Sequence, residues 1–503
     1  MAQLDFSMNL QNTRFSLLSS DQSRTVINPE RGGNPDPPTV SYSHNMMATT
    51  EGYKTIGYTV RTPDVPAIVS GFTLVRPIIA IDGSLHILGW DGVGQAYRIA
   101  GSAWQIVNPS PPPILLTETI TVGDVDGRSY IFYEGHGCFS YDSDTNTLNT
   151  VTLTGLDLSE VIGVAGSNGY LVAFTGDAIA WSSTLDPTDF VPSPVTGSGG
   201  GKIADIDGRI ILTTSVSTGL LIYTGHNVVA ASYTGNINFP WKLKEVPNSK
   251  GTSTIADIAF MSNSGPQFVR TFAGYQSVVP QTAEMLLPEV EDFLTGRRVE
   301  TFNEVTFVYD EVFTGANILT RLTLIGSRYL VISYGLAESP FNPLGPYTHA
   351  LIYDNVLSKL SKLLIRHIVC FDLSPIIAGA ANTNAIAFLQ LKGAVYTVDT
   401  NNSEEASGVL ILGKLQHRRG KFLTILEISL TNADIFTKAY VQTSLNGSSF
   451  TTKEASLKLT STQGERELID YNIRETGVNH SVVIIGNVNL VDVHTTYTEA
   501  GDR

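Results

Sequence analysis

The chain has 503 residues, of which 42% are hydrophobic and 16% are charged, and its formal net charge is −15. A chain of this length and apolar content can bury a large core, which excludes general disorder. The acidic balance excludes a simple DNA-binding protein, because affinity for phosphates comes mainly from Lys and Arg. Two cysteines, Cys138 and Cys370, are too few for a disulfide framework or a cysteine-rich zinc site, and they fit folding in a reducing cytoplasm.

Residues 1–64 predict an N-terminal arm with docking strands. The first 18 residues lack a basic stretch followed by an apolar core, so we expect no secretory signal. Residues 1–40 are polar and mixed and end in a proline-rich stretch, so they are either flexible or form a strand that docks elsewhere. Residues 45–60 become strand-like. We expect no membrane span anywhere, because no apolar run approaches about 18 residues.

One motif occurs four times between about Val75 and Ala230: an apolar strand, a tight turn and a second apolar strand. The turns are Asp82-Gly83, Asp126-Gly127, Asn168-Gly169 and Asp207-Gly208. Their glycines lie 44, 42 and 39 residues apart. A strand-based period of roughly 40–50 residues is typical of a β-propeller, with one blade for each period. Trp90, Tyr97 and Trp104 are expected to pack between blades.

Three looser units follow, at Ser264-Gly265, Gly326-Ser327 and Lys392-Gly393, so we predict six or seven blades within residues 65–403. The longer spacing requires insertions. By this interpretation, one insertion is a long loop at residues 337–349. Residues 280–298 predict a helix, because apolar residues recur there at helical spacing: Met285, Leu286, Val290, Phe293 and Leu294.

Residues 404–503 contain several strands joined by short polar turns, at a spacing typical of a sandwich or barrel. They predict either a separate C-terminal β-sandwich-like region or strands that close the propeller ring. The predicted fold class is therefore all-β.

Two stretches partly match ligand-binding loops. Residues 199–202 read Gly-Gly-Gly-Lys, but a phosphate loop would need Gly where Thr196 stands and Ser or Thr where Ile203 stands. We interpret residues 196–201 as a linker between blades. Residues 142–146 resemble the start of a calcium loop, but Thr147 and Leu153 occupy the positions of the required Gly and Glu. A solvated hairpin turn is the better interpretation.

Residues 444–450 resemble the Ser-x-Asp-x-Gly-x-Thr-Trp turn of sialidase-type propellers, although Asn446 replaces the Asp and the spacing is one residue shorter. A sialidase also needs an arginine cluster and a Tyr–Glu pair, which cannot be assigned here. Residues 414–421 (KLQHRRGK) form the one local basic cluster, with His417, Arg418 and Arg419 expected at its tip. It could meet phosphates or an acidic surface, or be a solvated turn. We assign no catalytic, cofactor-binding or metal-binding residue.

Several stretches resemble the tail nozzle or tail hub (packaged-DNA stabilisation) proteins of short-tailed bacteriophages. They are HNMMATTEGYKTIGY (44–58), AIAWSSTLDPTDF (178–190), GSRYLVISYG with HALIYDNVLSKLSKL (326–335 and 349–363), and the C-terminal run with GKLQHRRGKFLTILEISL, VQTSLNGSSF and GERELIDYNI. One departure is that Leu360 or Leu363 stands where the family usually has Trp.

This resemblance implies a virion protein without enzymatic activity or cofactor. It implies a homo-oligomeric, hexameric ring below the portal and the head-to-tail adaptor protein. The ring would carry tail fibres or spikes, continue the channel for double-stranded DNA, and be assembled in the host bacterial cytoplasm. The net charge fits a channel that repels phosphate, although it can equally serve solubility.

A carbohydrate-binding or glycoside-cleaving propeller is the alternative function. The enzyme would need two carboxylates roughly 5–10 Å apart in a pocket at the propeller axis. The lectin would need repeated aromatic-lined sites, and the ring protein a large head-to-tail interface.

Overall fold

The computed structural model describes only part of the chain. The described residues are 3–9, 14–15, 24–27, 39–44, 46–55, 57–62, 72–91, 93–100, 103–108, 119–204, 206–259, 266–287, 290, 301–302, 309–310, 318–325, 329–336, 349–364, 368–371, 386–390, 395–399, 408–418, 420–431, 437–445, 451–463 and 466–500.

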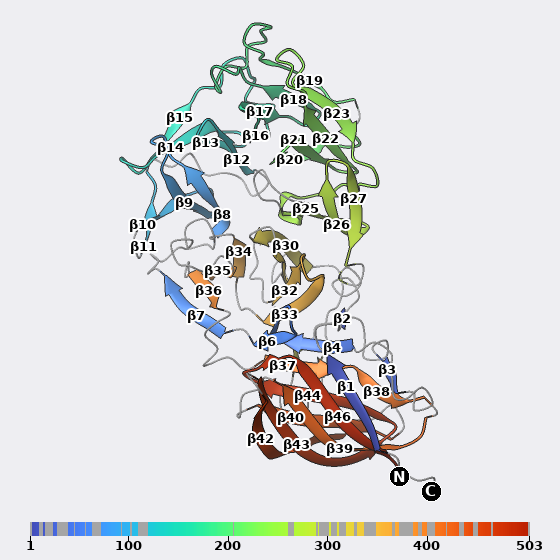
Figure 1. The fold of residues 1–503 in the computed structure, drawn as a ribbon. Helices are drawn as coiled ribbons and strands as arrows, with labels where there is room; N and C mark the ends of the chain where they lie inside the picture. Colours follow the sequence, from blue (N-terminus) through green and yellow to red (C-terminus); the bar gives the residue numbers. More distant parts are fainter. Residues whose placement is uncertain are drawn as a thin grey trace.

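Within the described residues, seven four-stranded antiparallel sheets follow one another around a ring and form a β-propeller with seven blades, which is joined to a β-sandwich (Figure 1). Strands are given from the innermost outward. The first blade has β8 (Phe72–Ile79), β9 (Leu85–Asp91), β10 (Ala96–Ala100) and β11 (Ala103–Ile106), and the second has β12 (Ile120–Val125), β13 (Arg128–Tyr133), β14 (Gly137–Asp142) and β15 (Thr147–Val151). The third has β16 (Gly163–Ser167), β17 (Tyr170–Phe174), β18 (Ala178–Trp181) and β19 (Gly199–Lys202), and the fourth has β20 (Ile210–Val216), β21 (Gly219–Thr224), β22 (Val228–Tyr233) and β23 (Trp241–Glu245).

The last three blades complete the ring. They are β24 (Ile258–Ala259), β25 (Gln267–Thr271), β26 (Gly274–Val279) and β27 (Thr282–Leu286); β30 (Ile318–Ile325), β31 (Tyr329–Leu336), β32 (His349–Asp354) and β33 (Lys359–Leu364); and β34 (Ile368–Phe371), β35 (Ile386–Gln390), β36 (Val395–Asp399) and β7 (Gly57–Thr62). Between the fifth and sixth blades, β28 (Thr301–Phe302) pairs with β29 (Tyr309–Asp310).

The ring is closed by a strand from the N-terminal region. β7 pairs antiparallel with β36 as the outer strand of the seventh blade, and β34 of that blade contacts β8 of the first. β7 falls inside the range that the sequence presents as an arm. A blade made from both ends of the propeller segment links the two ends by backbone hydrogen bonds, so opening the ring would break a whole strand pairing.

The middle strands of the blades are buried on both faces because neighbouring blades pack against each other. All of β13 except its first residue is buried, and so is all of β17. Trp90, Tyr97 and Trp104 are buried as expected, and Trp90 of the first blade donates a 2.6 Å hydrogen bond to the Tyr133 hydroxyl of the second.

Three of the four predicted turns join the first two strands of a blade. Asp126-Gly127 and Asn168-Gly169 have positive φ at both residues, the geometry of the two-residue hairpin turns that favour these pairs. The fourth prediction is wrong. Asp207-Gly208 precedes β20, and the Asp207 carbonyl accepts from the amide of His226 at 3.1 Å, at the β21–β22 turn. The central residues of all three later predicted turns lie outside the described residues.

The linker predicted at residues 196–201 is also wrong in its second half, because Gly199–Lys202 forms β19, the outer strand of the third blade. Glycines disfavour strands, which is why the sequence indicated a linker. Two of them fit close approaches here: a Cβ at Gly199 would lie 3.0 Å from the Trp181 ring, and one at Gly200 would lie 3.0 Å from the Ile179 carbonyl oxygen.

The predicted helix at 280–298 is wrong over residues 282–286, whereas Val290 of the same stretch is helical. Residues 282–286 form β27, which pairs with β26 across a two-residue turn and supplies the outer strand of the fifth blade. Pairing with β26 satisfies the backbone groups of this segment and overrides a helical spacing that is only a weak local preference. Residues 288–289 and 291–298 lie outside the described residues, as do the proline-rich connection at 109–113 and the predicted loop at 337–348.

Both ends of the chain build the sandwich at the lower end of Figure 1. One sheet has the order β1 (Gln3–Asn9), β46 (Asp492–Glu499), β39 (Leu423–Thr431), β43 (Arg466–Gly477) and β42 (Ser456–Gln463). The other has the order β2 (Arg14–Phe15), β4 (Thr39–His44), β37 (Gly408–Leu412), β44 (Asn479–Gly486), β38 (Lys414–His417) and β3 (Arg24–Ile27), with β40 (Lys438–Ser444) on β44 and β41 (Thr451–Glu454) on β40.

A small third sheet lies where the N-terminal segment leads towards the propeller. It consists of β45 (Asn489–Leu490), β6 (Tyr53–Thr55) and β5 (Met46–Ala48). Side chains from both ends of the chain, among them Phe6, Val40, Ile428 and Tyr497, share one apolar core. Of the two alternatives for the N-terminal region, its described strands are docked, and the propeller is therefore inserted between the two segments of the sandwich.

The contact between the innermost strands of neighbouring blades gives a first testable prediction. A Cβ at Gly166 of β16 would lie 2.1 Å from the backbone oxygen of Asp124 on β12. We expect Gly166→Ala to lower the free energy of unfolding by about 1–3 kcal/mol or more, because backbone must shift to admit the methyl group. Gly201→Ala is the matched control, since nothing lies within 4 Å of its Cβ position. Equal midpoints for both variants in urea unfolding would contradict this close contact.

Candidate functional site

A serine, a histidine and an aspartate meet at the first propeller turn, but in an order that cannot activate the serine. Ser84 Oγ lies 2.5 Å from Asp82 Oδ1 and 2.7 Å from His86 Nε2. The carboxylate can only accept, so the hydroxyl donates to Asp82 and the imidazole donates to Ser84. A nucleophilic serine must instead give its proton to the histidine. Hydrogen bonds from the Ser84 hydroxyl, the Ser84 amide and the Ser143 hydroxyl, in that order of size, lower the pKa of Asp82 to about 2, and the group stabilises the turn.

Residues 142–146 form the outer hairpin of the second blade, in agreement with the interpretation as a solvated turn. Asp142 Oδ1 accepts from the amides of Asp144 and Thr145, and Asn146 adopts a positive φ. In the part of the chain that the structure describes, no three His, Cys, Asp or Glu side chains are grouped so that they could hold a metal ion. Burial raises the pKa of the Cys138 thiol to about 12, so this thiol is a poor nucleophile.

The basic cluster at 414–421 is divided by the fold. Residues 414–417 form β38, where Lys414 and His417 are buried, so the prediction of His417 at an exposed tip is wrong. His417 Nε2 lies 3.0 Å from Glu499 Oε1. Arg418 is exposed at the turn, and Arg419 lies outside the described residues. Pairing of β38 with β44 and β3 turns half of this cluster inward.

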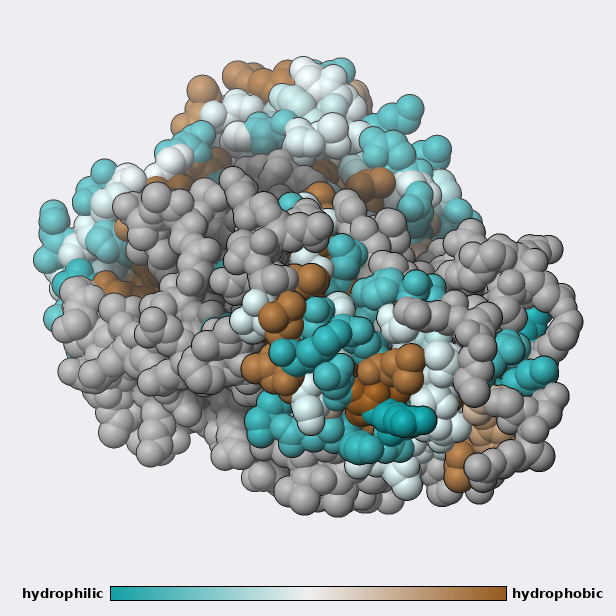
Figure 2. Space-filling model, turned by 60° about the horizontal axis from the view of Figure 1, so that its bottom comes forward, coloured by the Kyte–Doolittle hydropathy of each residue, from teal (hydrophilic) through white to brown (hydrophobic). Residues whose placement is uncertain are grey.

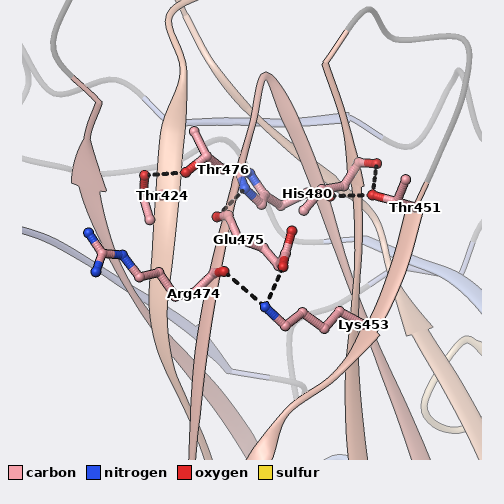
Figure 3. A network of polar contacts seen from close by, with 8 residues as sticks. Thr424, Thr451, Lys453, Arg474, Glu475, Thr476 and His480 are labelled. Atoms are coloured by element: carbon pink, nitrogen blue, oxygen red, sulfur yellow. Dashed lines mark hydrogen bonds and ion pairs between the residues drawn. The ribbon is translucent and has the colours of Figure 1, made fainter.

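A polar network crosses the sandwich near the start of β44 (Figure 3). Lys453 Nζ donates to Glu475 Oε1 at 2.6 Å and to the Arg474 carbonyl at 3.3 Å. His480 Nε2 lies 3.4 Å from the Glu475 carbonyl oxygen, while its Nδ1 is buried and finds no hydrogen-bond partner among the described residues. Burial lowers the pKa of His480 to about 4. Because this histidine is enclosed, it is a stability element and not an accessible acid or base.

Several strongly exposed apolar side chains of the described propeller gather at the outer rim of the third and fourth blades. We call them the rim surface: Leu185, Val191, Val195, Ile237 and Phe239. Leu185 and Val195 are each 82% exposed and Phe239 is 73% exposed. The first three belong to the β18–β19 loop and the other two to the β22–β23 loop, at the top of Figure 1. Exposed apolar clusters of this kind mark interaction sites.

The two loops of the rim surface are in contact. A Cβ at Gly197, the residue two before β19, would lie 2.4 Å from the Ile237 side chain. Sequence reasoning missed the rim surface, because exposure of a Leu or Phe cannot be read from its identity. Asp186-Pro187 after Leu185 and the asparagines flanking Ile237 were the only signals that these apolar residues lie in turns.

Exposed apolar side chains also occur at the other end of the molecule. Figure 2 shows hydrophobic patches enclosed by hydrophilic surface on the face at the sandwich end. Leu457 and Leu459 of the edge strand β42 are among the exposed apolar side chains of the sandwich. The sialidase-like turn falls mostly outside the described residues, which include only its first two positions, Ser444 and Leu445. No helix in the described segments is long and apolar enough to cross a membrane.

The fold therefore defines a β-propeller protein with an attached β-sandwich. No family model matches the chain, and no curated protein matches it. One similar solved structure is "YCF48 bound to D1 peptide", with 10% identity, 70% of this chain and 97% of that chain covered, and a TM-score of 0.36. Another is "Crystal structure of WD40 beta propeller domain of Doa1", with 8% identity, 66% and 98% covered, and a TM-score of 0.35. Likenesses at this level say nothing about function.

Proposed function

We propose that this chain is a structural subunit of the tail of a short-tailed bacteriophage. In this proposal it forms a ring, of six copies as the resemblance implies, below the portal and the head-to-tail adaptor. The ring continues the DNA channel, retains packaged DNA and passes it at ejection, and fibres or spikes attach to its outer surface. The chain acts by assembly and not by catalysis.

The resemblance to tail nozzle proteins is the observation that carries this proposal, and it extends over both domains. The stretch at 44–58 coincides with β5, β6 and the start of β7, where sandwich and propeller join. The stretch at 178–190 coincides with β18 and part of the rim surface, and those at 326–335 and 349–363 coincide with β31, β32 and β33. The C-terminal run coincides with strands of the sandwich.

The architecture is compatible with a subunit that works through its surfaces. A closed ring of blades is rigid, and its loops can serve as contacts without disturbing the core. Both chain ends belong to the sandwich, which leaves the rim surface of the third and fourth blades at the opposite end of the molecule (Figure 1). The net charge of −15 favours a channel wall that repels phosphate, so that DNA slides without adhering. Basic lumen-facing loops in an assembled ring would contradict this part of the proposal.

Mass measurement in solution tests the proposal directly. We expect the purified protein, alone or with a portal–adaptor preparation, to form a species of six times the 54.3 kDa chain mass. Light scattering or native mass spectrometry would measure it, and the portal–adaptor preparation without this chain is the control. The same samples should be tested with an array of immobilised glycans. A monomer that binds glycans and ignores the adaptor would overturn the proposal in favour of the carbohydrate alternative.

A further inference from the structure

We propose that the outer edge of the third blade is a docking site for an extended segment of a partner protein, which adds to the sheet beside β19 as a fifth strand. The apolar side chains of that segment lie on the rim surface. This inference does not depend on the proposed function, because it rests on the backbone geometry of one sheet edge and on the side chains beside it.

The hydrogen-bond pattern of the blade shows which backbone groups of β19 point outward. Ile203 donates to the Asp177 carbonyl at 3.0 Å, which continues the β18–β19 ladder by one residue pair. Antiparallel ladders alternate between bonded and non-bonded pairs, so Gly199 and Gly201 bond to β18 while Gly200 and Lys202 direct their N–H and C=O groups away. On the other side of β18, the Ser182 amide donates to the Leu171 carbonyl at 2.9 Å. This bond fits the same pattern, because successive residues of β18 bond in turn to β17 and to β19.

These outward groups form an open edge. β19 is the last strand of its sheet, and within the described part of the chain no backbone or side-chain group hydrogen-bonds to the amide or carbonyl of Gly200 or Lys202. An exposed edge of this kind is a template for another extended chain. Two residues with outward groups offer up to four backbone hydrogen bonds to one added strand.

Gly201 has no internal explanation in the described structure. Its φ is not positive, and nothing lies within 4 Å of the position that a Cβ would occupy. Glycine weakens a strand, and within strands it often marks a place where another backbone approaches closely. An added strand beside β19 supplies such a backbone. It accounts for Gly201, whereas close neighbours within the blade already account for Gly199 and Gly200.

The rim surface is held in place next to this edge by hydrogen bonds within its loops. Trp181 Nε1 donates to the Gly197 carbonyl at 2.8 Å, and the Ser198 hydroxyl donates to the Val191 carbonyl. In the neighbouring loop, Phe239 donates its amide to the Asn236 carbonyl at 3.1 Å. Leu185, Val195 and Phe239 are therefore exposed on well-braced loops, where they can bury apolar side chains of a bound strand at little cost in loop ordering.

The chemistry of this surface selects the occupant. Outward amides and carbonyls alternating along a strand match another extended backbone, whereas a nucleic acid would need clustered positive charge. Lys202 supplies the only cation on β19, and it is already paired with Asp177 at 2.7 Å. The partner segment is thus a β-strand with apolar side chains, in the manner of β-strand addition.

The test uses two substitutions of one residue in the full-length protein. Lys202→Pro removes an outward N–H without touching the ladder to β18, and proline is tolerated at such edge positions. Lys202→Ala removes the same exposed ion pair but keeps the N–H. The probe is a displayed library of short random peptides selected on the wild-type protein. We expect selected peptides to bind the Lys202→Ala variant as they bind wild type, and the Lys202→Pro variant at least about tenfold more weakly.

A second pair of variants keeps the test valid if the proline variant fails to fold. Phe239→Ser should weaken binding of the same peptides, whereas Val356→Ser, at a similarly exposed apolar residue in the sixth blade, should not. Bound peptide should also slow amide hydrogen exchange at Gly200 and Lys202. Peptides that do not distinguish the two variants in either pair would overturn the proposal. So would self-association of the peptide-free protein that Lys202→Pro abolishes, because the occupant would then be a second copy.

Discussion

Deletion of residues 1–64 should abolish cooperative folding of both domains, although the sequence presents this segment as an arm. β1 and β4 pair into the two sheets of the sandwich, and β7 is the outer strand of the seventh blade. The deletion leaves β46 and β36 without these partners and opens the sandwich core at Phe6 and Val40. Circular dichroism and urea unfolding of the shortened chain would measure the loss.

A point substitution examines the same segment without removing any strand. Phe6 is 2% exposed, and we expect Phe6→Ala to lower the free energy of unfolding by about 3–5 kcal/mol. Asp5→Ala on the same strand is the control, because its side chain is exposed and its polar contacts with Thr496 Oγ1 at 3.2 Å and His494 Nε2 at 3.9 Å lie at the surface, where such contacts contribute little. A shortened protein that unfolds at the wild-type midpoint, or equal losses for Phe6→Ala and Asp5→Ala, would show that β1 does not belong to the core.

Acidification should destabilise the sandwich through His480. Its folded-state pKa is lowered from 6.5 to about 4, chiefly by burial, so the folded protein binds fewer protons than the unfolded chain. The titration of His480 therefore leaves the free energy of unfolding unchanged above about pH 6.5 and lowers it as the pH drops towards about 4. This difference between the pKa of His480 in the unfolded and the folded state corresponds to a loss of about 3 kcal/mol at the acid end of that pH range. Urea unfolding between pH 7 and pH 4 would measure this.

The His480→Phe variant separates this effect from the titration of carboxylates in the same pH range. The substitution removes the titrating ring and the unpartnered Nδ1 while keeping an aromatic ring beside Tyr497. We expect its stability to decline less steeply between pH 6.5 and pH 4 than that of the wild type, with little loss at pH 7. Parallel pH profiles for the two proteins would refute the assignment of this slope to His480.

The outcome of each sequence prediction depended on whether its cause was local. Asp126-Gly127 and Asn168-Gly169 could be read as hairpin turns because their positive φ angles are a property of the two residues themselves. Asp207-Gly208 is the same kind of residue pair, but its position is set by the hydrogen bond between the Asp207 carbonyl and the His226 amide at another turn. Residues 282–286 were expected to be helical because an amphipathic spacing was visible, whereas the unpaired edge of β26 was not.

The candidate site was still less accessible to sequence reasoning. Catalytic and metal-binding groups have recognisable residue types, but a docking edge consists of backbone atoms that every residue carries. Residues 199–202 were excluded as a phosphate loop from sequence, yet their role as an edge strand required the position of β18. Likewise, Leu185 and Phe239 are ordinary apolar residues until the loops that hold them outward are known.

The all-β class, the period of about 40 residues and most of the early turns could be predicted from the sequence, because they follow from residue composition and local backbone preferences. The pairing of β7 that closes the ring, the place of β1 and β4 in the C-terminal sandwich, and the open edge formed by Gly199–Lys202 became evident from the three-dimensional structure. Strand pairing joins segments hundreds of residues apart, and the choice of partner depends on which edges the rest of the fold leaves unpaired.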